Sequence, residues 1–213
     1  MLAPIKATQH DLALRTSIRR RLDIFDARFD VDAALTPAAV AIVISQHSAT
    51  KEACIYLTLR SSSLRKHPGQ FALPGGKIDV GESVCQAALR ELSEELGLKL
   101  EEGQVLGRLD DFQTRSGFVI SPVVIWNDST DPLVINVDEV DTAYEITFAE
   151  LMSDQLAMVD DSQNPPMFSI APATIGHNVY SPTAAIIYQF REVLLLGKST
   201  RVAHFAQPAF AQR

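Results

Sequence analysis

Apolar residues recur along the chain at two periods, and each period predicts one kind of element. Residues 9–25 place leucine, isoleucine and phenylalanine at helical spacing with arginines between them, which predicts an amphipathic helix packed on the domain. Residues 84–96 have the same period, and residues 183–196 predict a last helix that is apolar on one side. The chain is therefore expected to contain at least three helices, spread from its beginning to its end.

Shorter apolar runs between these helices predict strands at residues 40–45, 53–60, 105–109, 118–126 and 139–146. The first run is nearly all apolar, which is typical of a central strand that is buried on both faces. Polar segments that contain proline predict a turn at 128–132 and a loop at 154–166. This order of elements suits an α/β/α sandwich, in which a mixed sheet lies between helix 84–96 and the last helix.

The helix at 84–96 has a clear signal at each end. Ser83 followed three residues later by Gln86 is a capping-box pattern. Gly97 stands where a left-handed residue commonly ends a helix.

Three carboxylates share one narrow arc of this helix. At about 100° per residue, Glu95 lies about 40° to one side of Glu91 and Glu94 about 60° to the other. The like-charge pair of Glu91 and Glu95 costs a few tenths of a kcal/mol in an isolated helix. A hard divalent cation would reverse that cost, since Mg²⁺ and Mn²⁺ prefer carboxylate oxygen. The simpler alternative is a solvated acidic face.

Residues 76–98 read GKIDVGESVCQAALRELSEELGL and resemble the Nudix box, G-x5-E-x7-R-E-U-x-E-E-x-G-U, where U is aliphatic. Every specified position is filled, by Gly76, Glu82, Arg90, Glu91, Leu92, Glu94, Glu95, Gly97 and Leu98. The resemblance implies a Nudix-type α/β/α sandwich with a mixed central sheet. It also implies hydrolysis of a phosphoric anhydride that depends on Mg²⁺ or Mn²⁺.

The resemblance assigns roles to individual residues. The implied metal ligands are Gly76, through its carbonyl, and Glu91, Glu94 and Glu95. The implied catalytic residues are Arg90, Glu94, Glu95 and Glu139. Glu139 lies in a segment, Asp138-Glu139-Val140 with Tyr144, that is similar to a D-E-V-x3-F segment of one Nudix branch, and its alternative role is structural.

Glu82 and Gly97 are implied to be structural members of the box. Arg90 is expected to brace the loop before the helix through Glu82, although Glu94 also lies within its reach on the helix. The alternative for Arg90 is a surface ion pair of little energetic value.

A second motif precedes the box. Residues 57–76 read LTLRSSSLRKHPGQFALPGG and resemble the signature of the coenzyme A pyrophosphatase branch, L-L-T-x-R-S-x3-R-x3-G-x3-F-P-G-G. Tyr56 replaces its first leucine and Leu73 its phenylalanine. The implied substrate-binding residues are Arg60, Arg65, Lys66, His67 and Gly75. Arginine suits phosphate because its planar fork makes two charge-assisted bonds, and the alternative is a basic loop exposed to solvent.

The chain departs from this branch near its end. Tyr180-Ser181-Pro182-Thr183-Ala184 stands where the branch has W-G-L-T-A, so the first three residues differ. Three functions therefore stay open. The first is hydrolysis of coenzyme A to 4′-phosphopantetheine and adenosine 3′,5′-bisphosphate. The second is hydrolysis of another nucleoside diphosphate, such as ADP-ribose or a dinucleotide. The third is a nucleotide-sensing module, which the retained box carboxylates disfavour.

Composition sets the outer limits. A chain of 213 residues with 46% hydrophobic content suits a single domain over 1–213, with a helical extension at 1–36, a core at 37–200 and a loose tail at 201–213. The net charge of −7 argues against non-specific nucleic-acid binding. The apolar runs are too short to span a membrane, and no secretory signal is recognisable. Two cysteines without a framework spacing favour a reducing, cytoplasmic setting. The expected partner is a small nucleotide resembling coenzyme A, and a homodimer is left open.

Overall fold

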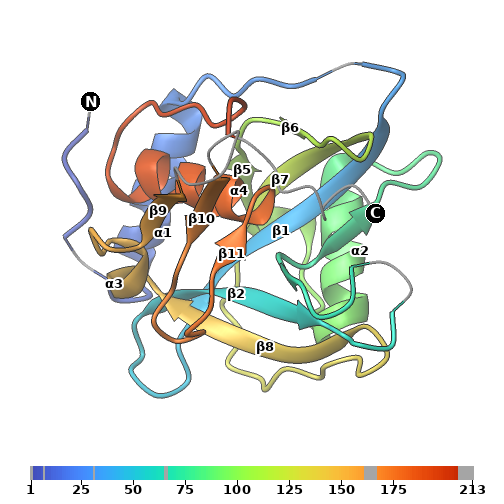
Figure 1. Ribbon diagram of the computed structural model, residues 1–213. Coiled ribbons are helices and arrows are strands. Elements are labelled where there is room, and N and C mark those ends of the chain that lie inside the picture. Colours follow the sequence, from blue (N-terminus) through green and yellow to red (C-terminus); the bar gives the residue numbers. More distant parts are fainter. Residues whose placement is uncertain (1, 7, 31, 65–66, 161–166, 206–213) are drawn as a thin grey trace.

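The fold is organised around one mixed sheet (Figure 1). The computed structural model describes residues 2–6, 8–30, 32–64, 67–160 and 167–205. Along the sheet the strand order is β3 (Phe71–Ala72), β2 (Ala53–Arg60), β1 (Thr36–Gln46), β7 (Phe118–Trp126) and β5 (Val105–Arg108). Three further strands join it, with β4 (Gly75–Lys77) on β1, β6 (Phe112–Gln113) on β7 and β8 (Val140–Thr147) on β2. β1 runs antiparallel to β2 and parallel to β7, so the predicted mixed sheet and its central first strand are confirmed.

Alternation along β1 divides the core into two layers. Ala39, Ala41 and Val43 pack with the buried residues of α2 (Val84–Leu96). Ile42 and Ile44 point to the opposite face, where the core includes residues of α1 (Leu12–Ile24) and α4 (Thr183–Phe190). Successive side chains of a strand face opposite sides, so a strand this apolar must be covered on both. Figure 1 shows α2 on one side of β1 and both α1 and α4 on the other, as the predicted α/β/α sandwich requires.

Both ends of α2 form as the sequence predicts. The Ser83 hydroxyl accepts a hydrogen bond from the Gln86 backbone N–H at 3.2 Å, and the Gln86 side chain accepts one from the Ser83 N–H at 2.9 Å. Gly97 ends the helix in the left-handed conformation with φ 71°. A β-carbon at Gly97 would lie 2.7 Å from Cβ of Val134, so a side chain is excluded there by space as well as by backbone angle.

A second, smaller sheet was not predicted. β9 (Ala157–Asp160), β10 (Met167–Ile170) and β11 (Val179–Tyr180) pair antiparallel. The prediction of a loop over 154–166 is therefore wrong for 157–160, and residues 161–166 lie outside the described part of the chain. The remaining short elements are a 3-10 turn (Glu102–Gln104) and α3 (Phe148–Leu151). The predicted last helix begins at Thr183 as expected, but it continues past Phe190 as a π-helical turn (Arg191–Leu195).

Both ends of the described chain are tied to the main core. Leu14 and Ile18 of α1 are buried in it. In the part of the expected loose tail that the structure describes, 201–205, Arg201 pairs with Asp110 and the ring of Phe205 stacks on Phe168 at 4.1 Å. The rest of the predicted tail, 206–213, lies outside the described residues. Within the described ranges, no helix combines the length and the apolar character that a membrane crossing needs.

Candidate active site

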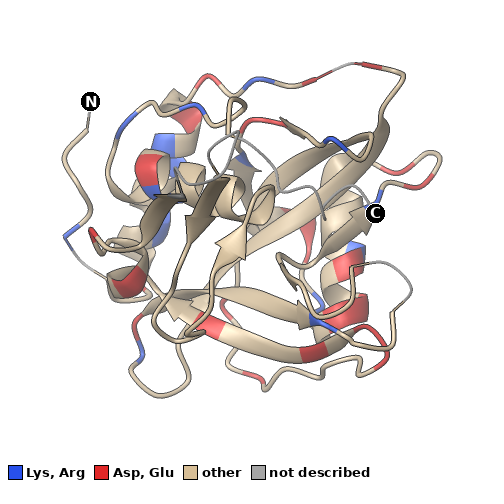
Figure 2. Cartoon of the chain, viewed as in Figure 1, with Lys and Arg blue, Asp and Glu red and all other residues tan. Residues whose placement is uncertain are grey.

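The three carboxylates predicted on α2 differ strongly in exposure. The side chain of Glu95 is 3% exposed and that of Glu91 is 13% exposed, whereas Glu94 is 51% exposed. Glu95 and Glu91 therefore lie on the more buried side of α2, and Glu94 lies on its solvent-exposed side. The face is therefore not a uniformly solvated acidic surface, which was the simpler alternative. Figure 2 shows acidic segments of α2 close to the basic end of β2.

Arg90 forms hydrogen bonds with three other residues of the box. Its guanidinium donates to Glu82 at 2.9 Å, to Glu91 at 2.8 Å and to Glu94 at 3.2 Å. A further bond to the Lys77 carbonyl, at 3.0 Å, joins the helix to β4. Arg90 thus pairs with both partners that the sequence left open. The bonds to Glu82 and Glu91 raise the pKa of the Arg90 guanidinium, and the bond to Arg90 lowers the pKa of Glu82.

Arg60 reaches the carboxylates from the sheet. It ends β2, and its Nη1 lies 3.9 Å from Oε1 of Glu95. No described residue forms a hydrogen bond with Nε of Arg60 or with Oε2 of Glu95, and both atoms are buried. Buried charged groups normally have all their polar atoms paired. This pair is incomplete, so both side chains have capacity left for a ligand.

Burial changes the proton affinity of the two inner carboxylates. Loss of water around Glu95 raises its pKa to about 8; the nearby Arg60 and the Gly75 backbone oppose the increase, whereas Glu91 and Glu139 add to it. Loss of water also raises the pKa of Glu91, against the effect of its bond to Arg90. Carboxyl groups with raised pKa values that share a cleft edge are a common feature of catalytic sites.

Two glycines let the backbone of β4 approach the site closely. A β-carbon at Gly76 would lie 2.2 Å from Oε1 of Glu91, and one at Gly75 would lie 2.3 Å from the Ala39 carbonyl oxygen. Gly76 therefore places its main chain directly against a box carboxylate. Gly75 is required by the packing of β4 on β1, whatever else it contacts.

Glu139 faces the same group of charges. It precedes β8, and its carbonyl accepts a hydrogen bond from the Ser61 N–H at 2.9 Å, next to Arg60. Its carboxylate is close enough to raise the pKa of both Glu91 and Glu95. Glu139, from outside the box, therefore lies near Glu91 and Glu95.

The chemistry of this group fits a hard divalent cation. Four carboxylates, one with a buried unpaired oxygen, and the adjacent Gly76 backbone supply oxygen donors of the kind that Mg²⁺ and Mn²⁺ prefer. Among the described residues, no three acidic, histidine or cysteine side chains surround one point as a ligand shell does. In this conformation Arg90 binds Glu91 and Glu94, and Arg60 lies beside Glu95.

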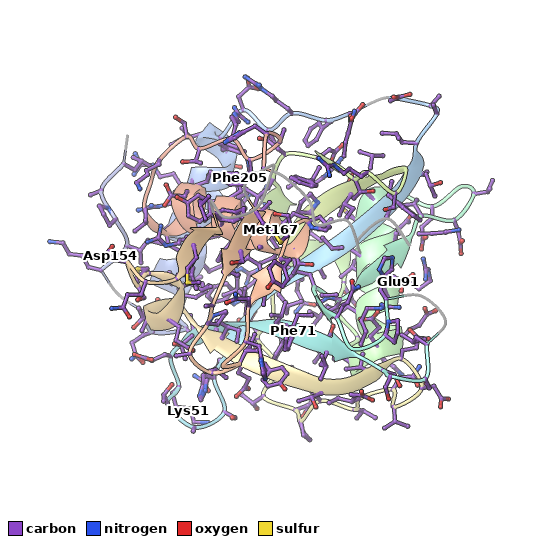
Figure 3. The ribbon with its side chains drawn as sticks, in the orientation of Figure 1. Lys51, Phe71, Glu91, Asp154, Met167 and Phe205 are labelled. Atoms are coloured by element: carbon purple, nitrogen blue, oxygen red, sulfur yellow. The ribbon has the colours of Figure 1, made fainter. Side chains whose placement is uncertain are left out.

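A cleft of about 910 Å³ reaches the box at Gly76. Arg60, Gly75 and Gly76 form the edge that it shares with the box, and His67 also lines it. Arg65 and Lys66 lie outside the described residues. Phe71 also lines the cleft, as do Tyr144 of β8 and residues 177–183 from later in the chain. Figure 3 shows Phe71 beside β2 and Glu91 on α2.

Several residues that line the cleft were not predicted from the sequence. Phe71, Lys77, His177 and Asn178 line the cleft without having been predicted there. Phe71 lies within the upstream motif at residues 57–76 and so had a local signal. His177 follows β10 by several residues, and no local pattern connects it with a site more than 70 positions earlier in the chain.

Comparison with known proteins places the chain in a family. The family model described as "NUDIX domain" matches residues 35–165, more than half of the chain. The chain belongs to the Nudix family. The fold agrees, since a MutT/nudix family protein from Enterococcus faecalis superposes with a TM-score of 0.56 over 89% of this chain and 72% of its own, at 16% identity.

Two curated Nudix relatives align with part of the chain. "Nudix hydrolase 3" of Caenorhabditis elegans is 32% identical over 119 residues, which cover 54% of this chain and 50% of the relative. "Uncharacterized Nudix hydrolase NudL" of Yersinia pestis (strain Pestoides F) is 38% identical over 103 residues, covering 48% and 52%. The chain thus spans about half the length of these curated Nudix relatives.

Proposed function

We propose that this Nudix protein hydrolyses the phosphoric anhydride of a nucleoside diphosphate derivative in the presence of Mg²⁺ or Mn²⁺. The observation that carries the proposal is the position of the half-buried Glu91 and the buried Glu95, each with a pKa raised in part by Glu139. Gly76 lies against Glu91 and Arg60 lies beside Glu95, and both Gly76 and Arg60 line the 910 Å³ cleft. Charge-assisted donors beside a set of oxygen ligands suit a diphosphate held by a cation.

Glu91, Glu94, Glu95 and the Gly76 carbonyl would hold the cation. When bound, such a cation neutralises charge on the diphosphate and acidifies water. Glu139 or one of the box glutamates accepts the proton of the attacking water. Arg60 contacts the diphosphate, and Arg90 keeps the box carboxylates oriented through its bonds to Glu82, Glu91 and Glu94.

The substrate that we favour is coenzyme A or a derivative, giving 4′-phosphopantetheine and adenosine 3′,5′-bisphosphate. Its support is the upstream motif at residues 57–76, whose Arg60, His67 and Gly75 line the cleft. Arg65 and Lys66 of the same motif remain proposed phosphate ligands. Gly97 and Glu82 have supporting roles at the two ends of the box.

A second substrate class has its own support. Tyr180, Ser181 and Pro182, where the chain departs from the coenzyme A pyrophosphatase pattern, line the cleft. Different side chains in the wall of the cleft change which substrate group, beyond the diphosphate, the cleft accepts. Another nucleoside diphosphate derivative, such as ADP-ribose or a dinucleotide, is therefore the alternative substrate.

Product analysis by liquid chromatography and mass spectrometry separates these substrates. Coenzyme A, 3′-dephospho-coenzyme A, ADP-ribose, NADH and a nucleoside triphosphate are compared with Mg²⁺ or Mn²⁺ present. Fast release of 4′-phosphopantetheine from coenzyme A, with slow turnover of the others, is the expected result. Faster hydrolysis of ADP-ribose or NADH would favour the alternative, and no hydrolysis of any substrate would refute the proposed activity.

A further inference from the structure

Two backbone hydrogen bonds tie the segment before β8 to the C-terminal end of α2. The Val134 N–H donates to the Leu96 carbonyl and the Asn136 N–H donates to the Glu95 carbonyl, each at 3.0 Å. Carbonyls in the last turn of a helix have no partner within the helix, so these bonds complete the end of α2. The main chain of Asn136 is therefore fixed to Glu95, the most buried carboxylate residue of the box.

Asn136 also forms the turn that leads to Glu139. Its carbonyl accepts hydrogen bonds from the Glu139 N–H at 3.0 Å and from the Val140 N–H at 2.9 Å. Its side-chain oxygen, Oδ1, accepts a third bond from the Asp138 N–H at 3.2 Å, as asparagine commonly does with the residue two positions later. The backbone of Glu139 is thus held in place relative to Asn136 and, through it, relative to α2.

The side chain of Asn136 reaches the Glu139 carboxylate as well. Its amide nitrogen Nδ2 donates to Oε1 of Glu139 at 3.5 Å, which is a long hydrogen bond. A glutamate side chain rotates about several bonds, so a fixed main chain does not by itself decide where the carboxylate lies. Hydrogen bonds to a charged acceptor are stronger than those between neutral groups, so this contact favours one position of the carboxylate.

The position of Glu139 makes this contact relevant to the site. Glu139 is partly buried and lies near both Glu91 and Glu95. On its other side, its carbonyl accepts the bond from Ser61, next to Arg60. Asn136 is not among the residues that line the cleft, so any effect that it has on the reaction acts through Glu139.

We propose that Asn136 is a positioning residue, which holds the carboxylate of Glu139 beside the box carboxylates. The inference rests on the proposed function, in which Glu139 belongs to the reacting site. One residue fixes both the main chain of Glu95 and the side chain of Glu139, so it sets the distance between the two.

A double-mutant cycle of Asn136→Ala and Glu139→Gln tests the inference, with Mg²⁺ and with the substrate of the panel above that is hydrolysed fastest. Asn136→Ala should lower kcat roughly 3- to 100-fold and leave KM nearly unchanged. It should have no further effect in the Glu139→Gln background, because the carboxylate that it positions is then absent.

A second substitution separates the contact with Glu139 from the turn. Asn136→Ser keeps an oxygen that can accept the bond from the Asp138 N–H, but its side chain is shorter and lacks the amide. Asn136→Ser should therefore lower kcat as Asn136→Ala does. Full activity of Asn136→Ser would show that the turn alone is sufficient, and would overturn the inference.

Asn127 provides the matched control for the loss of such a turn. Its Oδ1 accepts a bond from the Ser129 N–H at 2.9 Å, and its Nδ2 donates to Ser45 at 3.1 Å. Asn127 does not line the cleft. Asn127→Ala should lower Tm and leave kcat unchanged when turnover is measured well below that Tm.

Proton–nitrogen NMR spectra of the metal-free protein provide a measurement that does not depend on turnover. The side-chain amide signals of Asn136 should move upfield in Glu139→Gln, because their charged acceptor is lost. They should stay in place in Asp131→Asn, which removes an exposed charge earlier in the same segment.

Three results would overturn the inference: additive effects of Asn136→Ala and Glu139→Gln on kcat, full activity of Glu139→Gln, or Asn136 amide signals that ignore Glu139→Gln. Failure of the proposed function looks different. Hydrolysis by the wild type together with full activity of Glu139→Gln leaves the activity standing and removes the positioning role. Absence of hydrolysis with the amide shift retained refutes the activity and leaves the contact between Asn136 and Glu139 standing.

Discussion

Glu95 occupies the most unusual environment among the charged residues of the site. Its carboxylate is almost fully buried, one of its oxygens has no partner among the described residues, and its nearest cation, Arg60, lies 3.9 Å away. A buried charge that is incompletely paired destabilises the fold unless a ligand completes its bonds. The environment of Glu95 is therefore more readily explained by a role in ligand binding than by a role in stabilising the fold.

The position of Arg60 predicts which part of the substrate it contacts. Arg60→Gln should weaken the binding of coenzyme A and of 3′-dephospho-coenzyme A to the same extent, about 10-fold or more. The reason is that a guanidinium beside Glu95 is placed for the diphosphate that both substrates share. Values of KM for the two substrates provide the measurement. A loss confined to coenzyme A would instead assign Arg60 to the 3′-phosphate, which 3′-dephospho-coenzyme A lacks.

The pKa of Glu95 predicts how stability depends on pH. With a folded pKa of about 8 against an ordinary value near 4.3, the native state binds a proton more tightly than the unfolded state. The free energy of unfolding of the metal-free protein should therefore fall as pH rises from about 4.5 to about 8. Glu91 acts in the same direction, whereas the lowered pKa of Glu82 contributes stability that is lost only as pH falls through that value.

Urea unfolding at several pH values measures this effect. Glu95→Gln should be less sensitive to pH than the wild type between 4.5 and 8, with Glu94→Gln as the control because Glu94 is half exposed. Parallel pH profiles for Glu95→Gln and wild type would show that Glu95 ionises normally.

Sequence reasoning found the box residues and the pairing of Arg90 with Glu82, but not the contact between Arg60 and the box. The carboxylates could be placed on one arc because helical geometry fixes the angle between residues. The contact between Arg60 and Glu95 depends on the position of the end of β2 relative to α2. Packing between elements far apart in the chain determines that position. The same holds for the contact between Phe71 of β3 and His177 of the loop between β10 and β11, whose ring centroids lie 6.5 Å apart.

Among the helices and strands, the sequence predicted the bounds most accurately where a cap or a long apolar run marks the ends of the element. The expected bounds of α2 and β7 match the structure, since the first has a capping box and a glycine stop and the second is almost wholly apolar. The second sheet was missed because β9 is short and is stabilised by pairing with β10 across the polar segment that separates them. Short strands of this kind carry too few residues for a period to be recognised.

The junction between β4 and α2 makes a prediction about Gly76. Gly76→Ala should lower cation-dependent turnover by at least 10-fold with little loss of stability, because the added β-carbon displaces the flexible end of Glu91 and not the backbone. Steady-state kinetics and thermal unfolding together separate the two effects. Gly103→Ala is the matched control, since nothing lies within 4 Å of its added β-carbon. Equal activity of the two variants would show that the contact between Gly76 and Glu91 has no part in turnover.

At the scale of the whole molecule, the sheet brings three separate parts of the chain to one place. β2 and β4 carry Arg60 and Gly76 to α2, while β8 and the second sheet close the cleft from the other side. The fold class followed from the order of elements, because few layer arrangements can bury both a central apolar sheet and the apolar faces of the helices. The cleft itself could not be predicted, as its walls are formed by short strands and loops.

Cation binding should stabilise the whole molecule. Ligand binding to the native state alone adds about 2.7 kcal/mol when the free cation is at 100 times its Kd. For a chain of this size, that corresponds to an increase in Tm of about 5 to 10 °C. Differential scanning fluorimetry with Mn²⁺ and with a chelator should show the increase in wild type and its loss in Glu94→Gln. The same Tm in all conditions would exclude a cation site at the box.

Cation-dependent hydrolysis at the box is tested most directly by the release of 4′-phosphopantetheine from coenzyme A, measured for the wild type and for Glu94→Gln, each with Mg²⁺ or with chelator. We expect release by the wild type with Mg²⁺, none with chelator, and a decrease in kcat of several orders of magnitude in a Glu94→Gln protein that remains folded by circular dichroism. Undiminished release by Glu94→Gln, or by the wild type with chelator, would contradict cation-dependent hydrolysis at the box.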